Sequence, residues 1–118
     1  MRSILSLTFV SFVLLLSCGK DDTSTTDCNG ITPTYTVDIA PIYNASCATA
    51  GCHGGSFPAE GIDLSNYSKA KSESLNNDDV LKSIKHASGV KAMPQGAAKL
   101  SDDKIKLIEC WIKNGAPQ

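Results

Sequence analysis

The sequence CATAGCHGG, residues 47–55, constrains this chain of 118 residues more than any other stretch. Two thiols followed at once by an imidazole are the chemistry of covalent haem attachment, in which each thiol forms a thioether and the histidine binds the iron. The common spacing is Cys-x-x-Cys-His. Here four residues separate Cys47 from Cys52, which is a less frequent variant, and we expect a looser loop before His53.

A haem iron that carries electrons has a second axial ligand from the protein. Met93 is the leading candidate, because it precedes Pro94 in a loop expected between two helices. Its thioether would favour ferrous iron and raise the reduction potential. His86 is the alternative ligand, since it is the only histidine besides His53. Otherwise we expect His86 to be a surface residue or one that supports a ligand.

The first 17 residues predict a signal peptide. Arg2 gives a positive start, and the apolar stretch from Ile4 to Leu16 is shorter than a membrane-spanning helix needs. The sequence LLSC, residues 15–18, resembles the bacterial lipobox, in which the cysteine is acylated and becomes the new N-terminus. We therefore expect lipidation at Cys18, because several acyl chains hold a protein stably at a membrane. An ordinary cleaved signal with an incidental cysteine is the alternative.

Residues 18–35 form a polar tract and predict a flexible tether, since they are rich in Ser, Thr and Asp and offer little to bury. The tract resembles the segment that follows the lipid-bearing cysteine in outer-membrane lipoproteins. Its charged run, residues 20–22, also resembles a surface-export signal of some Gram-negative lineages. We expect a protein of the cell envelope, anchored to the outer membrane and either periplasmic or surface-exposed.

The remaining residues, 36–118, predict one small domain. Without Arg2, the chain carries 10 Lys against 12 Asp plus Glu, a formal charge of −2. This balance and the lack of a basic block argue against nucleic acid as a partner.

Each of the five cysteines can be assigned a role. Cys18 is assigned to lipid and Cys47 and Cys52 to haem, which leaves Cys28 and Cys110 for a disulfide in an oxidising compartment. In the chain-entropy description, such a bridge would stabilise the fold by roughly 4 kcal/mol. Sequence does not determine the pairing, and Cys28 lies in a polar tract, so this disulfide stays open at this point.

The patterning predicts helices and no strands. Asp38 and Ser65 are expected N-caps of the first two helices, and Ser101 of the last, which Gly115 would end. Pro94 excludes a helix at Met93, so residues 90–96 are expected to form a loop. The expected helices cover residues 36–46, 66–74, 78–87 and 102–113.

These features resemble a small monohaem class I c-type cytochrome. The similarity covers most of residues 37–117 and rests on the apolar run 39–42, the haem motif, Met93-Pro94, and the segment from Leu100 into WIKNGAP, residues 111–117. The resemblance implies an all-α, cytochrome c-like bundle of about four short helices around one haem. It implies that Cys47 and Cys52 are the thioether sites, His53 the proximal ligand and Met93 the distal one. Aromatic residues are sparser than in that family.

The resulting functional hypothesis is an electron-transfer protein that carries one covalently attached haem c and meets redox partner proteins, and is not an enzyme. One alternative is a haem-free structural or binding lipoprotein domain stapled by a disulfide between Cys47 and Cys52. A second is a zinc site made by these cysteines with His53 and His86, which has the right ligand count. A haem enzyme would need an acid or base, and the sequence supplies no evident one.

Overall fold

The computed structural model describes residues 26–118; the expected signal peptide and Cys18 lie outside this range. Its helical elements are η1 (Tyr35–Ile39), α1 (Ala40–Ser46), η2 (Ala59–Gly61), α2 (Tyr67–Asn76), α3 (Asp78–Lys85) and α4 (Asp102–Lys113). Over these residues there is no strand, apart from one isolated bridge between Ala50 and Gly54. The predicted all-α fold is therefore confirmed. Within the same range, we find no helix with the length and apolar character that crossing a bilayer requires.

The first helix begins earlier than predicted. One π-helical turn, η1, runs directly into α1, and Thr34 stands at its N-cap position. Asp38 was the expected cap, but its carboxylate accepts a hydrogen bond from the backbone N–H of Thr34 at 2.8 Å. Asp38 thus stabilises the same helix start from inside the first turn. Pro41 follows near the start of α1, where a missing N–H is tolerated.

The two middle helices lie close to their predicted positions but differ at their ends. Asn66 caps α2 in place of Ser65, because its side-chain oxygen accepts the backbone N–H of Lys69 at 3.1 Å. Asn77 caps α3 in the same way. The third helix ends at Lys85, and His86 closes it in a left-handed conformation with φ of +57°.

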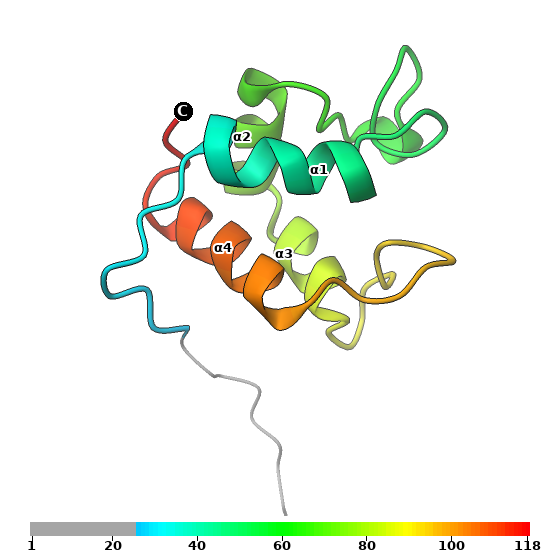
Figure 1. Ribbon diagram of the computed structural model, residues 1–118. Coiled ribbons are helices and arrows are strands. Elements are labelled where there is room, and N and C mark those ends of the chain that lie inside the picture. The colour runs from blue at the N-terminus through cyan, green and yellow to red at the C-terminus, as the bar shows by residue number, and fades with distance from the viewer. Residues whose placement is uncertain (1–25) are drawn as a thin grey trace, which may run out of the picture.

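Helices α1 and α4 share an aromatic core. Trp111 of α4 is fully buried, and its ring lies 5.9 Å from Tyr35 and 6.2 Å from Tyr43 between centroids. The indole Nε1 donates a hydrogen bond to the carbonyl of Pro117 at 2.7 Å, so no polar group of this side chain is left unpaired. In Figure 1, α3 lies beside α4, and the loops before α2 and before α4 extend from the same side of the helices.

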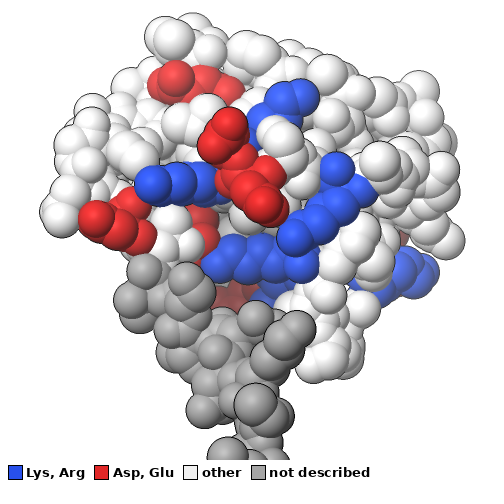
Figure 2. Space-filling model, turned by 60° about the horizontal axis from the view of Figure 1, so that its bottom comes forward, with Lys and Arg blue, Asp and Glu red and all other residues white. Residues whose placement is uncertain are grey.

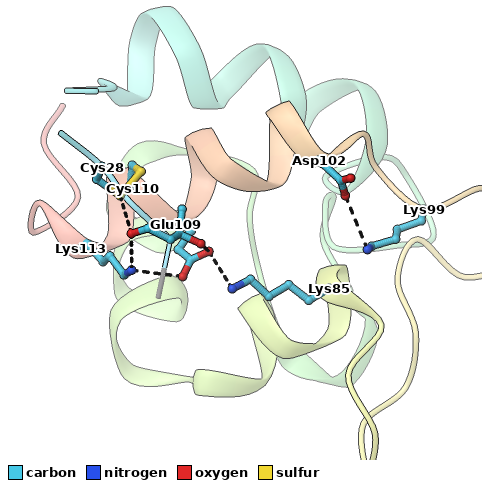
Figure 3. A network of polar contacts seen from close by, with 8 residues as sticks. Cys28, Lys85, Lys99, Asp102, Glu109, Cys110 and Lys113 are labelled. Carbon is cyan, nitrogen blue, oxygen red and sulfur yellow. Dashed lines mark hydrogen bonds and ion pairs between the residues drawn. A yellow bond between two sulfur atoms is a disulfide. The ribbon is translucent and has the colours of Figure 1, made fainter. Parts of the chain in front are cut away.

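The segment before η1 is attached to α4. Cys28 and Cys110 form a disulfide, the pairing that the cysteine count left open. Next to it, Figure 3 shows the carboxylate of Glu109 between the ammonium groups of Lys85 and Lys113. Thr26 donates a hydrogen bond to the same carboxylate. The Cys28–Cys110 disulfide and the Thr26 hydrogen bond therefore join the described end of the predicted tether, residues 18–35, to α4.

Candidate functional site

An open cavity of about 390 Å³ lies between the loop after α1 and the loop after α3. This volume falls within the roughly 300–1,000 Å³ of small-molecule and cofactor pockets. Aliphatic side chains of Ile62, Leu64, Val80, Ile84 and Val90 contribute to its lining, together with three predicted site residues, Cys47, His53 and Met93. The fourth, Cys52, is exposed and does not line the cavity.

The four residues between the motif cysteines form a turn. The backbone N–H of Cys52 donates to the carbonyl of Thr49 at 3.0 Å, and Gly51, inside this turn, has a φ of +82° that glycine adopts without steric cost. The N–H of His53 then donates to the carbonyl of Cys47 at 3.0 Å. The loop is therefore closed on itself rather than loose, and the longer spacing still returns His53 to the first cysteine.

The imidazole of His53 is oriented by the backbone of a later segment. Its Nδ1 lies 3.1 Å from the carbonyl oxygen of Ile62. Because a carbonyl can only accept, this contact assigns the proton to Nδ1 and leaves the lone pair of Nε2 available to a metal. The N–H of Leu64 also donates to the carbonyl of His53 at 2.8 Å. His53 is thus fixed through both its ring and its backbone.

Of the two candidates for the second axial ligand, only Met93 lines the cavity. Its backbone N–H donates to the carbonyl of Ser83 at 3.0 Å, which attaches its loop to α3. His86 does not line this cavity; its Nε2 lies 3.0 Å from the carbonyl oxygen of Met93. The structure therefore brings His53 and Met93 to one cavity and gives His86 a contact with the Met93 backbone.

The zinc alternative does not fit the described residues. Among residues 26–118, no group of three or more His, Cys, Asp or Glu side chains is placed to hold a metal ion. Burial, with a smaller contribution from Cys52, raises the pKa of the Cys47 thiol to about 11. Cys47 and Cys52 are both free thiols, the first buried and the second exposed.

The donor set does fit a c-type haem. An imidazole nitrogen and a thioether sulfur are known axial ligands of haem iron, and two free thiols suit thioether formation. The aliphatic lining suits the apolar faces of a macrocycle. Sequence reasoning missed two supporting groups, the carbonyls of Ile62 and Ser83. For His86 it gave a residue that supports a ligand only as one of several alternatives. No sequence signal marks the two carbonyls, because every residue type has one.

Comparison with protein families gives one match. Residues 36–112, more than half of the chain, match the family model described as cytochrome C oxidase, cbb3-type, subunit III. The matched range contains the motif cysteines, His53 and Met93. No curated protein and no solved structure gives a significant match to this chain.

Proposed function

This chain belongs to the cytochrome C oxidase, cbb3-type, subunit III family of c-type cytochrome domains, and we propose that it transfers single electrons through one covalently attached haem c. The observation that carries the proposal is the cavity that Cys47, His53 and Met93 share. A haem bound there supplies an iron that alternates between the ferrous and ferric states.

The residues of the chain have distinct parts in this proposal. Cys47 and Cys52 would form the two thioethers. Nε2 of His53 and the sulfur of Met93 would hold the iron. The aliphatic side chains of the cavity would keep water from most of the cofactor and lower the local polarity, which is one of the means by which a protein sets a haem potential. With both residues as ligands, the iron would have no position for a substrate, and we propose no catalytic activity.

Partner contacts of such a carrier are expected to be small and transient, as is usual for redox encounters. Figure 2 shows one face of the molecule on which Lys and acidic side chains lie side by side rather than in separate fields. Among the described residues, oppositely charged side chains pair, such as Lys82 with Asp79 at 3.5 Å and Lys99 with Asp102 at 3.7 Å. This interleaving does not favour a polyanion such as nucleic acid as the partner.

Attachment to the cell envelope is a further part of the proposal. The chain would be exported by the signal peptide of residues 1–17, acylated at Cys18 and held at the outer membrane. The Cys28–Cys110 disulfide supports a location outside the cytoplasm, since such bridges persist in oxidising compartments.

Covalent haem is tested by expression in cells with a working cytochrome c maturation system. The wild-type polypeptide should keep its haem stain on a denaturing gel, and the mass of the intact chain should include one haem. The double variant Cys47→Ser/Cys52→Ser should lose the stain, because both thioethers are removed. The double variant Cys28→Ala/Cys110→Ala is the matched control and should keep it. A wild-type chain of haem-free mass would instead favour the haem-free lipoprotein.

Lipidation is tested with Cys18→Ser in the exporting host. We expect the variant to move from the membrane fraction to the soluble fraction, because it lacks the sulfur that is acylated. Ser17→Ala is a control, since a small residue before the cysteine is kept. Equal membrane retention of Cys18→Ser and wild type would contradict the anchor.

A further inference from the structure

The last turn of α3 makes two hydrogen bonds to the backbone of Met93. The Met93 N–H donates to the carbonyl of Ser83, and the Met93 carbonyl accepts from Nε2 of His86, each at 3.0 Å. We propose that His86 is a positioning residue, which holds the Met93 loop so that the thioether stays on the iron. The proposal rests on the proposed function, because it takes Met93 as the distal ligand.

The backbone of His86 is in a conformation that favours glycine. Its φ is +57°, and its N–H closes the end of α3 on the carbonyl of Ser83 at 3.1 Å. The N–H of Ala87 adds a second closing bond to the carbonyl of Lys82 at 3.0 Å. Glycine or asparagine is the usual residue at such a helix end, because a larger side chain is strained there. The left-handed backbone gives histidine no advantage over glycine here, so a separate role of His86 must lie in its ring.

The direction of the hydrogen bond between His86 and Met93 indicates that His86 supports the Met93 loop and does not bind the iron itself. The carbonyl oxygen of Met93 can only accept, so Nε2 of His86 carries the proton and presents no lone pair. The His86 ring is exposed and faces a second groove, on the side of α3 away from the cavity lining. His86 therefore secures the loop from outside while Met93 lines the cavity.

Ser83 joins the two parts of this arrangement. Its carbonyl accepts from both the His86 N–H and the Met93 N–H, so the end of α3 and the Met93 loop share one acceptor. Local opening of the loop must break the bonds on both sides of Met93. Without the His86 ring, one of the two is missing, and the open population should rise by roughly fivefold, the equilibrium effect of one ordinary hydrogen bond.

Two substitutions distinguish the contribution of the His86 ring from that of the His86 backbone as a helix cap. His86→Gly removes the donor but suits the left-handed backbone, so a residue that served only as a cap would be replaced at no cost. His86→Gln keeps an N–H donor at a similar reach from the backbone. Both are made in the full-length haem protein, with amide hydrogen exchange of Met93 and the rate of cyanide binding to the ferric form as readouts. Cyanide takes the iron position only after Met93 has left it.

We expect His86→Gly to accelerate Met93 amide exchange and cyanide binding by roughly fivefold while the denaturation midpoint stays equal or rises. His86→Gln should remain within about twofold of wild type in both rates. Wild-type rates in His86→Gly, or equally fast rates in both variants, would overturn the positioning role. Failure of the proposed function would be recognised by other measurements. The wild-type protein would then lack haem, or its oxidised form would lack the far-red sulfur-to-iron charge-transfer band of a bound thioether, whatever the exchange rate of Met93.

Discussion

The chemistry of the candidate site depends on which side-chain atoms of His53 and Met93 are not used in hydrogen bonds and are available to bind a metal. In His53, Nδ1–H donates a hydrogen bond to the carbonyl of Ile62, which leaves the lone pair of Nε2 available to a metal. In Met93, the backbone N–H is hydrogen-bonded to Ser83 of α3 and the carbonyl to the ring of His86, so the thioether is the group left to bind a metal. A hard cation would gain little from this pair, whereas haem iron accepts both an imidazole and a thioether.

Replacement of Met93 by alanine tests the distal ligand. We expect Met93→Ala to abolish the weak far-red sulfur-to-iron charge-transfer band of the oxidised protein, because no thioether remains. The reduction potential should fall, since a ligand that prefers ferrous iron is lost, while haem stays attached through Cys47 and Cys52. Val90→Ala, which shortens another side chain of the same cavity, should keep the band. A band that persists in Met93→Ala, measured by visible spectroscopy and redox titration, would assign the position to another residue.

At the scale of elements, the connection from α1 into the motif loop is the tightest part of the site. Gly54 is buried, and a Cβ atom placed on it would lie 2.1 Å from the carbonyl oxygen of Ala48 and 2.7 Å from its carbonyl carbon. These are backbone atoms of the closed motif turn, so they cannot move aside as a flexible side chain would. The adjacent Gly55 has open space around its Cβ position and a φ of +81°.

The two glycines should respond differently to alanine. We expect Gly54→Ala to destabilise the domain by about 1–3 kcal/mol, the usual range for overpacking, and to lower the yield of haem-stained protein. Gly55→Ala carries only the strain of a left-handed backbone, about 1–2 kcal/mol, and should attach haem normally. Haem stain per polypeptide and chemical denaturation measure the two effects. Equal haem yields in both variants would mean that the motif turn adapts to the added methyl group.

The elements that sequence predicted well are those set by local pattern. Helix α4 has Ser101 at its N-cap position, an acidic first turn and an apolar face in one continuous stretch, and its boundaries were predicted, although the Ser101 side chain makes no capping hydrogen bond. The haem motif and Met93 were visible because their residue types are chemically specific. The π-helical turn of η1 and the choice of Asn66 over Ser65 were not, because neighbouring backbone and side-chain partners decide them.

The same distinction holds within the candidate site. Cys47, His53 and Met93 were singled out from the sequence, and support of a ligand was one of the alternatives for His86. The closed motif turn and the bond from His86 to the Met93 carbonyl were not predicted. The turn depends on backbone hydrogen bonds between Cys47, Thr49 and His53, and the bond from His86 depends on the loop after α3 folding back on that helix. Sequence spacing carries no information on such returns of the chain.

In the whole molecule, the candidate cavity and the N-terminal attachment involve different loops and helix ends. The cavity lies between the loops after α1 and α3. The attachment joins Cys28 to the C-terminal half of α4 (Figure 3). Glu109, 5% exposed, is the centre of the attachment, with Lys85 at 2.6 Å and Lys113 at 3.3 Å. Burial acts to raise the pKa of Glu109, but the hydrogen bonds and charges of its partners outweigh it, so the pKa lies below its ordinary value.

A lowered pKa means that the folded state favours the ionised carboxylate. The stabilisation from Glu109 is therefore present above its ordinary pKa of 4.5 and is lost as the pH falls through the lower value of the folded state. The disulfide has no such dependence, because joined cysteines do not titrate. The contributions of Glu109 and of the disulfide to stability can thus be distinguished by their pH dependence.

Removal of the disulfide should lower global stability and leave the haem site intact. The bridge spans 82 residues of sequence, and in the chain-entropy description its loss costs about 4 kcal/mol. We expect Cys28→Ala/Cys110→Ala to show this loss in chemical denaturation at both pH 7 and pH 4, with an unchanged visible spectrum. Glu109→Gln, which keeps the bridge, should lose stability at pH 7 and approach wild type in acid. A double variant as stable as wild type would show that the segment before η1 adds nothing to the fold, and a changed spectrum would show that the attachment and the cavity are coupled.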